Sequence, residues 1–346
     1  MPIPAITAVV ITYRRPTMLR RAIHSVLKQT YPHFRVCVYD DASGDETAEV
    51  VEELRKKDSR VEYLCHQSNL GMTATFVDGA DRVETPFFSF LPDDDVMLPN
   101  FFEVALAGFQ RYPEAGMSIL STISMTPRGF VFPANVLRWP EGLLMPPHGA
   151  LCTLRYGNPG LQAMLIRKDA WQEVGGFDKM TIPIEEVDFD LRVAARMPIV
   201  VSRRCGAIQV MHPGSFSVQT VGPEWIWPIP RIIKKLKDMN LTAAATAEAT
   251  ERLTRWMKRD LVMRGGFRSI SDGEWANATK AADLLEQECG RVQVARLIRT
   301  AASLSQRLPG TRKLFRAPLA LRAGVRAARS VGLQWRFRSY AKFLHV

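Results

Sequence analysis

The sequence contains few cysteines, and their spacing argues against two common kinds of site. The five cysteines are Cys37, Cys65, Cys152, Cys205 and Cys289. They are odd in number, widely separated, and none belongs to a C-x-x-C pair. This pattern argues against a disulfide framework and against a zinc site built on thiolates. We therefore expect reduced thiols and a cytoplasmic protein.

The chain also lacks a long hydrophobic run. No stretch of about eighteen consecutive apolar residues occurs, which argues against a membrane-spanning helix. The first residues enter an apolar segment without a charged region before it, so no signal peptide is predicted. Hydrophobic residues make up 47% of 346 residues, which is enough for a large α/β domain with an addition, or for two domains.

Acidic residues are scarce in the last third of the chain. Residues 1–220 contain 22 Lys and Arg against 25 Asp and Glu, whereas residues 221–346 contain 24 against 10. The net charge of +11 therefore arises in residues 221–346. From residue 307 onward there is no Asp or Glu at all.

The first two thirds of the chain alternate between strand-like and helix-like segments. We expect strands at residues 5–11, 34–39, 61–65 and 86–91, with helices beginning at Pro16, at Thr47 and at residue 70. Further strands are expected at 117–124 and 160–167, with one or two strands at 198–211, and further helices are expected at 168–174 and 184–197. Residues 126–160 are rich in Pro, Gly and aromatic residues and are expected to form loops. The alternation predicts βαβ units and a mostly parallel sheet.

Polar groups follow three of the expected strands. Thr12 to Arg14 come after the first, Asp40 and Asp41 after the second, and Asp93 to Asp95 after the fourth. Parallel sheets bind ligands beyond the carboxyl ends of their strands, so these groups are predicted to share one edge. Three adjacent carboxylates need a cation, and Mg²⁺ or Mn²⁺ suits oxygen ligands, although a solvated turn before a helix has the same composition.

Eight short motifs over residues 5–215 occur in a recognisable order. They are VVITYRRP, QTYP, VYDDASGDET, NLGMT, LPDDDVMLP, GGFD, IEEVDFDLR and a His before a Gly-Ser turn. Together they resemble glycosyltransferase family 2, which has the GT-A fold, a Rossmann-like, mostly parallel sheet with flanking helices. The resemblance implies a metal-dependent, inverting enzyme that moves one sugar from a nucleoside-diphosphate sugar, UDP-linked, to an acceptor hydroxyl. Polysaccharide or glycolipid assembly is the implied setting.

The resemblance also assigns residues to the donor. The implied nucleotide-binding residues are Thr12, Tyr13, Arg14, Asp40, Asp41 and Asp93. The implied ligands of Mn²⁺ or Mg²⁺ are Asp94, Asp95 and His212. Asp94 aligns best with the direct ligand, but Pro92 stands where the common pattern has an acidic residue. Phe76 and Val77 replace an Arg and an Asn of the family.

The catalytic base is implied to lie in the segment Glu185-Glu186-Val187-Asp188. Glu186 takes the position of the family's base, with a Glu in place of the usual Asp. Glu185 and Asp188 are the alternatives, and Asp188 could instead fix a neighbouring side chain. Acidic residues also favour a helix N-terminus through its dipole. No Q-x-x-R-W motif follows, which favours transfer of a single sugar over processive synthesis.

The basic last third matches no motif. We expect a GT-A domain over residues 1–220 and a basic helical region over 221–346. Its cationic and apolar residues fit an anionic membrane surface, such as the inner face of the plasma membrane, with a glycan or lipid-linked glycan as acceptor. Two other interpretations are a face that packs on a second subunit and, less favoured, a nucleic-acid-binding surface. Trp225 and Trp227 could stack on an acceptor sugar or anchor this region.

Two other functions share part of this pattern. A nucleotidyltransferase would need a Gly-rich phosphate loop after the first strand, which ITYRRPT lacks. A non-catalytic protein that binds nucleotide sugars or carbohydrates is the main alternative, because the base position holds Glu. It would bind a donor without turnover.

Overall fold

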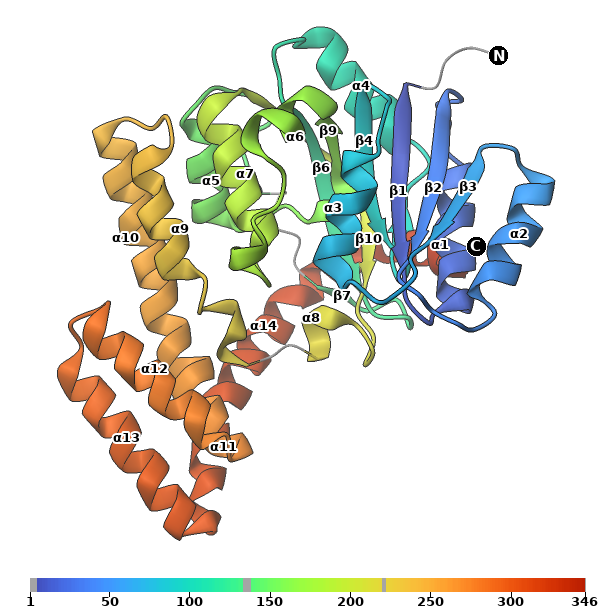
Figure 1. The fold of residues 1–346 in the computed structure, drawn as a ribbon. Helices are drawn as coiled ribbons and strands as arrows, with labels where there is room; N and C mark the ends of the chain where they lie inside the picture. The colour runs from blue at the N-terminus through green and yellow to red at the C-terminus, as the bar shows by residue number, and fades with distance from the viewer. Residues whose placement is uncertain (1–4, 133–137, 220–221, 346) are drawn as a thin grey trace. The chain divides into compact units, whose positions relative to one another are not determined.

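The computed structural model describes residues 5–132, 138–219 and 222–345. The chain forms two compact units (Figure 1). The first comprises Met1–Lys179, Glu185–Ser215 and Leu333–Val346, and the second comprises Met180–Ile184 and Phe216–Gly332. The division into domains after residue 220 stays a prediction. The contacts within the chain assign its C-terminal segment, from Leu333 onward, to the first unit.

Ten strands of the described residues form one sheet in the first unit. Its order is β3-β2-β1-β4-β9-β6-β10-β5, with β7 paired to β6 and β8 to β10. The bounds are β1 (Ile6–Thr12), β2 (Phe34–Asp40), β3 (Val61–Cys65), β4 (Phe87–Pro92), β5 (Val96–Met97), β6 (Met117–Met125), β7 (Val131–Phe132), β8 (Gly142–Leu144), β9 (Met164–Arg167) and β10 (Ile199–Val210).

Strand direction brings several chain segments to one edge of this sheet. β1 is parallel to both β2 and β4, β2 is parallel to β3, and β6 is parallel to β10. β9 lies between β4 and β6 and is antiparallel to both. One edge of the sheet therefore contains the beginning of β9 and the carboxyl ends of β1, β2, β3, β4, β6 and β10. Figure 1 shows β3, β2, β1 and β4 side by side. The expected mostly parallel α/β sheet is confirmed.

Helices cover both faces of the sheet. They are α1 (Pro16–Leu27), α2 (Thr47–Lys57), α3 (Met72–Asp81), α4 (Phe101–Arg111), α5 (His148–Tyr156), α6 (Lys168–Val174) and α7 (Glu185–Arg196). Ile6, Ala8 and Val10 of β1 share a core with buried residues of α1, α2 and α4. Phe88 and Phe90 of β4 face the other way and form an aromatic cluster with α3, α6 and α7. Burial on both faces explains why β1 reads as a continuous apolar run.

Two local expectations were wrong. Residues 161–163, at the start of the strand expected at 160–167, form a 3₁₀ helix, η2 (Leu161–Ala163), after Gly160 at φ +95°. Residues 148–156, within the segment expected to be loop, form α5. At Gly149 an added Cβ would come within 2.8 Å of Ile199 Cδ1, so close packing against β10 specifies this helix where the sequence pattern does not.

The second unit is helical. Its elements are α8 (Phe216–Gln219), η4 (Pro223–Trp225), α9 (Ile229–Lys235), η5 (Leu236–Asp238), α10 (Ala243–Asp260), the π-helix η6 (Leu261–Arg268), α11 (Ser269–Asp272), α12 (Trp275–Gln287), α13 (Val292–Arg307), η7 (Pro309–Phe315) and most of α14 (Arg316–Phe337). A short 3₁₀ helix, η3 (Lys179–Thr181), spans the boundary. The Thr242 side chain caps α10, whose Ala245, Ala249 and Leu253 are buried. Lys280 Nζ lies 4.4 Å from the ring centre of Trp227, so that tryptophan has a partner within this unit.

The end of the chain belongs to the first unit. Phe337 and Leu344, from α14 and η8 (Arg338–His345), are buried with residues of β5, β6 and β10, including Ile123 and Ile208. No helix in the described ranges is long and apolar enough to cross a membrane.

Candidate active site

The ends of β1 and β4 are joined through Asp93. Thr12 Oγ1 donates to Asp93 Oδ2 over 2.8 Å, and the Tyr13 N–H donates to the same oxygen over 3.3 Å. Burial and the neighbouring Asp94 carboxylate raise the pKa of Asp93 to about 6, against the opposing effect of Arg15. The predicted nucleotide residues Thr12, Tyr13 and Asp93 therefore lie together. The Tyr13 side chain itself is exposed.

Arg15 supplies a positive charge to this site, and the sequence analysis did not single it out. Its Nη1 lies 3.2 Å from Asp93 Oδ1 and 3.1 Å from Asp94 Oδ2, so one guanidinium bridges two carboxylates. Its Nη2 donates to the carbonyl of Gly214. The signal was available in the sequence, since adjacent carboxylates need a positive charge and Arg15 immediately follows the first strand's polar end.

His212 contacts Asp94. Its Nε2 lies 3.1 Å from Asp94 Oδ2, and the Gly214 N–H donates to its Nδ1 over 3.1 Å. Because Nδ1 accepts a hydrogen bond, a neutral imidazole carries its proton on Nε2 and donates it to Asp94. In this geometry His212 orients Asp94 and does not offer a lone pair to a metal.

Asp95 is turned away from its two neighbours. Its Oδ1 accepts from the Val210 N–H over 2.8 Å, and its Oδ2 accepts from the Gln162 amide. The residue is 2% exposed, and burial together with Asp94 raises its pKa well above the usual range. Asp95 thus ties β4 to the end of β10 and to η2.

The triplet fits a metal ion only through Asp94. No three His, Cys, Asp or Glu side chains of the described ranges are placed to hold one ion together. Asp94 Oδ1 is the one carboxylate oxygen of the triplet without a hydrogen bond within the part of the chain that the structure describes. Mg²⁺ is commonly held by one or two carboxylates with substrate phosphates and water, so Asp94 suits such an ion.

The pair after β2 organises the next loop. Asp41 Oδ1 accepts from the Leu70 N–H over 2.7 Å, and its Oδ2 accepts from the Gly71 N–H over 2.8 Å. His66 Nδ1 lies 3.2 Å from Asp41 Oδ1. A carboxylate has about four acceptor positions, so Asp41 retains one for a ligand.

Asp40 and Arg14 hold the turn beside Asp41. Asp40 accepts from the Tyr63 hydroxyl over 2.6 Å and from the Ser43 N–H over 2.9 Å. The Arg14 N–H donates to Ser43 Oγ over 2.8 Å, and its backbone adopts φ +55°. Both oxygens of Asp40 are engaged inside the protein. These contacts give Asp40 a structural role in the turn.

The acidic segment predicted to contain the base forms the first turn of α7. Glu185 is buried, and its Oε1 accepts from Thr73 Oγ1 over 2.5 Å. Its Oε2 is buried without a hydrogen bond in the described structure. Glu186 is half-buried. Its pKa is raised to about 8, chiefly by burial and to a smaller extent by the negative charge of Glu185.

Asp188 has a structural role. It is fully buried and accepts from Arg192 Nε over 2.8 Å. Arg192 Nη2 in turn donates to the carbonyl of Gly176 over 2.6 Å. The pair fixes α7 against the Gly175-Gly176 turn, which is the alternative that the sequence left open for Asp188.

Asp190 is an acidic residue of α7 that the sequence analysis missed. It is 1% exposed, and its Oδ2 accepts from Asn158 Nδ2 over 2.9 Å. Its Oδ1 has no hydrogen-bond partner in the described structure. Burial and the charge of Glu186, one helical turn earlier, raise its pKa well above the usual range. The four-residue spacing from Glu186 was the available signal.

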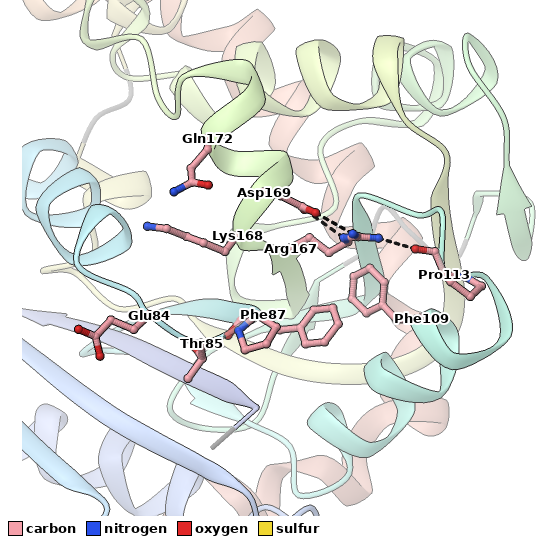
Figure 2. A pocket seen from close by; sticks show the side chains of 10 residues that line it. Glu84, Thr85, Phe87, Phe109, Pro113, Arg167, Lys168, Asp169 and Gln172 are labelled. Atoms are coloured by element: carbon pink, nitrogen blue, oxygen red, sulfur yellow. Dashed lines mark hydrogen bonds and ion pairs between the residues drawn. The ribbon is translucent and has the colours of Figure 1, made fainter. Parts of the chain in front are cut away.

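A separate cavity lies at the opposite edge of the sheet (Figure 2). Its volume is about 570 Å³, and it is lined by residues at the start of β4 and the end of β9. Arg167 pairs there with Asp169, and Lys168 Nζ donates to the Ala80 carbonyl over 2.7 Å. Since β4 runs from this cavity toward Asp93, the cavity is not part of the acidic site.

Comparison with known proteins relates the N-terminal part of this chain to a known family. The model described as Glycosyl transferase family 2 matches residues 7–140. The similarity to glycosyltransferase family 2 therefore covers the part of the chain from β1 to residue 140. It is 34% identical over 96 residues, 28% of this chain, to the GalNAc(5)-diNAcBac-PP-undecaprenol beta-1,3-glucosyltransferase of Campylobacter jejuni. That match spans 31% of the relative's length.

Solved structures of other proteins show the same fold as this chain. Residues 1–349 of TarS from S. aureus, in complex with UDP-GlcNAc, match with a TM-score of 0.66 at 16% identity, over 88% of this chain and 92% of that one. The mannosyltransferase PcManGT from Pyrobaculum calidifontis, in complex with GDP-Man and Mn²⁺, matches with a TM-score of 0.54 at 14% identity, over 94% and 86%. These matches confirm the expected GT-A fold.

Proposed function

We propose that this chain transfers one sugar from a nucleoside-diphosphate sugar, UDP-linked, to an acceptor hydroxyl, with inversion at the anomeric carbon. The observation that carries the proposal is Asp94 at the end of β4. It presents an unpaired carboxylate oxygen beside a guanidinium and an imidazole, at the sheet edge where such folds bind ligands. The solved neighbours in complex with UDP-GlcNAc and GDP-Man support the donor class.

The nucleoside is assigned to the ends of β1 and β2. Asp41 has capacity for one more hydrogen bond, which a base N–H or a ribose hydroxyl can donate. Thr12 and Asp93 line the adjacent strand end, and the exposed Tyr13 ring and Arg14 are available to the ligand. Asp40 supports this pocket through the turn that it holds.

We assign Mn²⁺ or Mg²⁺ to Asp94, with His212 and Asp95 as residues that position it. When bound, such an ion would act as a Lewis acid toward the diphosphate. The Mn²⁺ in the PcManGT complex supports this assignment. The hydrogen bonds of Asp95 to Val210 and Gln162 favour a role in fixing the strand end over direct ligation.

Glu186 is assigned as the general base. Its carboxylate takes the proton of the acceptor hydroxyl, whose oxygen forms a bond to the anomeric carbon. The bond from that carbon to the phosphate oxygen breaks, and the nucleoside diphosphate leaves with the electron pair. A pKa of about 8 suits a base that works near neutral pH. Glu185 is the neighbouring acid that tunes it.

The test is release of nucleoside diphosphate from a panel of nucleotide sugars with Mn²⁺ and candidate acceptors. We expect Glu186→Gln to lower turnover by about 100-fold or more, since positioned proton transfer contributes that much. Asp94→Asn should lower turnover by a similar factor, because it removes the carboxylate assigned to the metal ion. Asp169→Asn and Glu103→Gln are matched controls on the surface and should retain wild-type turnover. Undiminished turnover in both site variants would refute the assignments.

A non-catalytic binding protein is the second candidate. It is favoured by Glu186, which stands where glycosyltransferase family 2 usually has an Asp as base. This alternative predicts that nucleotide sugars raise the melting temperature of the protein while no nucleoside diphosphate is released over a panel of acceptors.

The C-terminal region is proposed to meet an anionic membrane surface that carries the acceptor. Leu321 and Trp335, fourteen residues apart and on one face of α14, are 71% and 89% exposed. Arg316 is the first residue of this helix, Arg336 lies in its last turn, and no acidic residue occurs in it. A cationic helix with exposed apolar side chains suits the headgroup region of an anionic bilayer.

A further inference from the structure

The guanidinium of Arg15 lies between the carboxylates of Asp93 and Asp94. One nitrogen lies 3.2 Å from a carboxylate oxygen of the first and 3.1 Å from a carboxylate oxygen of the second. The two aspartates are nearly inaccessible to solvent, whereas the Arg15 side chain is 32% exposed. Because solvent reaches the guanidinium, it can move away from the two carboxylates. The buried carboxylates then need another positive charge, since an unpaired buried charge is destabilising.

The backbone of Arg15 is fixed, so the exchange requires movement of its side chain alone. Arg15 directly precedes Pro16 at the first turn of α1, which fixes its backbone. Its second terminal nitrogen donates to the Gly214 carbonyl, next to His212. Arg21, one and a half turns later in α1, donates to the Asp94 carbonyl and remains as a second positive group nearby. The cluster therefore keeps one cation when Arg15 turns away.

We propose that Arg15 is the resident counter-ion of Asp93 and Asp94, which a divalent cation displaces, and that the released guanidinium then pairs with the donor diphosphate. This inference rests on the proposed function. Guanidinium groups bind phosphate oxygens through two parallel N–H donors, so the diphosphate replaces the partners that Arg15 loses. Asp94 Oδ1, which has no hydrogen bond in the described structure, is the oxygen that first meets the ion.

This exchange makes the binding of metal and nucleotide interdependent. Without nucleotide the ion competes with a positive charge that is already in place, and its affinity is low. With nucleotide present, Arg15 has a new partner and the ion binds more tightly. Coupling of this kind is reciprocal, so Mn²⁺ must raise the affinity for UDP by the same factor.

The experiment is a titration of the protein with Mn²⁺, followed by the electron paramagnetic resonance signal of the free ion, with and without UDP. For Arg15→Gln we expect Mn²⁺ alone to bind about tenfold more tightly than in the wild type, and UDP in the presence of Mn²⁺ to bind about tenfold more weakly, which corresponds to 1.4 kcal/mol for each change. Arg20→Gln, on the exposed face of α1, is the control and should match the wild type.

Arg15→Lys keeps the charge without the planar group, so it should bind Mn²⁺ alone within about threefold of the wild type and lose most of the UDP effect. Melting curves verify that each variant is folded. Unchanged or weaker Mn²⁺ binding in folded Arg15→Gln, with UDP still bound by the wild type, overturns this inference alone. A wild type that binds neither UDP nor Mn²⁺ overturns the proposed function with it.

Discussion

At the scale of single residues, carboxyl groups with raised pKa values gather where the family motifs predicted a site. Burial is the first cause for Asp93, Asp95, Glu185, Glu186 and Asp190. Ionised groups are costly in such surroundings, and proteins retain them mainly where chemistry needs them. Their clustering at strand ends and at the start of α7 supports the proposed assignments.

The raised pKa of Glu186 gives a pH prediction. A general base works in its ionised form, so kcat/KM should increase with pH and level off above about 8. Glu185→Gln removes the like charge beside it and retains an acceptor for Thr73, so the inflection should move toward acid by about half a unit to one unit. The measurement is kcat/KM from pH 5.5 to 9.5. A profile that is flat over this range, or an inflection that Glu185→Gln leaves in place, contradicts the role of Glu186.

The sequence predicted the position of the site better than its contacts. Thr12, Asp93 and Asp94 were expected at one sheet edge and His212 at the same metal ion, and the structure joins the four residues in one network through Arg15. Arg15, Gln162 and Asp190 were missed because their importance comes from partners far away along the chain. Gln162 donates a hydrogen bond to Asp95, 67 residues away in the sequence, and no local sequence pattern predicts such a contact.

At the scale of elements, the clearest periodic segments were predicted well. The strand expected at residues 61–65 coincides with β3, and the helix expected at 168–174 coincides with α6. α5 and η2 were missed because tertiary packing specifies them. β10 was expected as one or two strands and forms one, with register irregularities between Val201 and Ala207.

The buried ion pair in α7 gives a stability prediction. Asp188→Asn should lower the free energy of unfolding by about 3–5 kcal/mol, because it leaves the Arg192 charge without its partner inside the protein. The measurement is urea denaturation of the variant and of the wild type. Glu53→Gln, which breaks the exposed pair with Arg20, is the control and should have the same free energy of unfolding as the wild type. Equal stability of Asp188→Asn and the wild type would show that the pair does not fix α7.

At the scale of the whole molecule, the chain forms two compact units that differ in architecture. The first contains the sheet and every residue assigned to the donor or to catalysis. The second is helical, as expected for the basic region, but residues 333–346 return to the first unit. That return could not be predicted, because the apolar residues of the tail show no preference for either unit in the sequence.

Membrane attachment belongs to this scale and has its own test. Sedimentation with vesicles of phosphatidylcholine and phosphatidylglycerol should carry down the full chain, and the bound fraction should fall as salt is raised. Trp335→Ser and Leu321→Ser together should lower the bound fraction several-fold, because both exposed apolar side chains are lost. Phe130→Ser, an exposed aromatic outside α14, is the control. A bound fraction that changes neither with lipid charge nor with the two substitutions contradicts the proposal.

The central claim is that a nucleoside diphosphate binds at the carboxyl edge of this sheet, with its phosphates at Asp94. A crystal structure of the protein soaked with UDP and Mn²⁺ tests it most directly. The account predicts the ion and the diphosphate beside Asp94, and the nucleoside between Thr12 and Asp41. Nucleotide bound in any other place, or an ion far from Asp94, would contradict it.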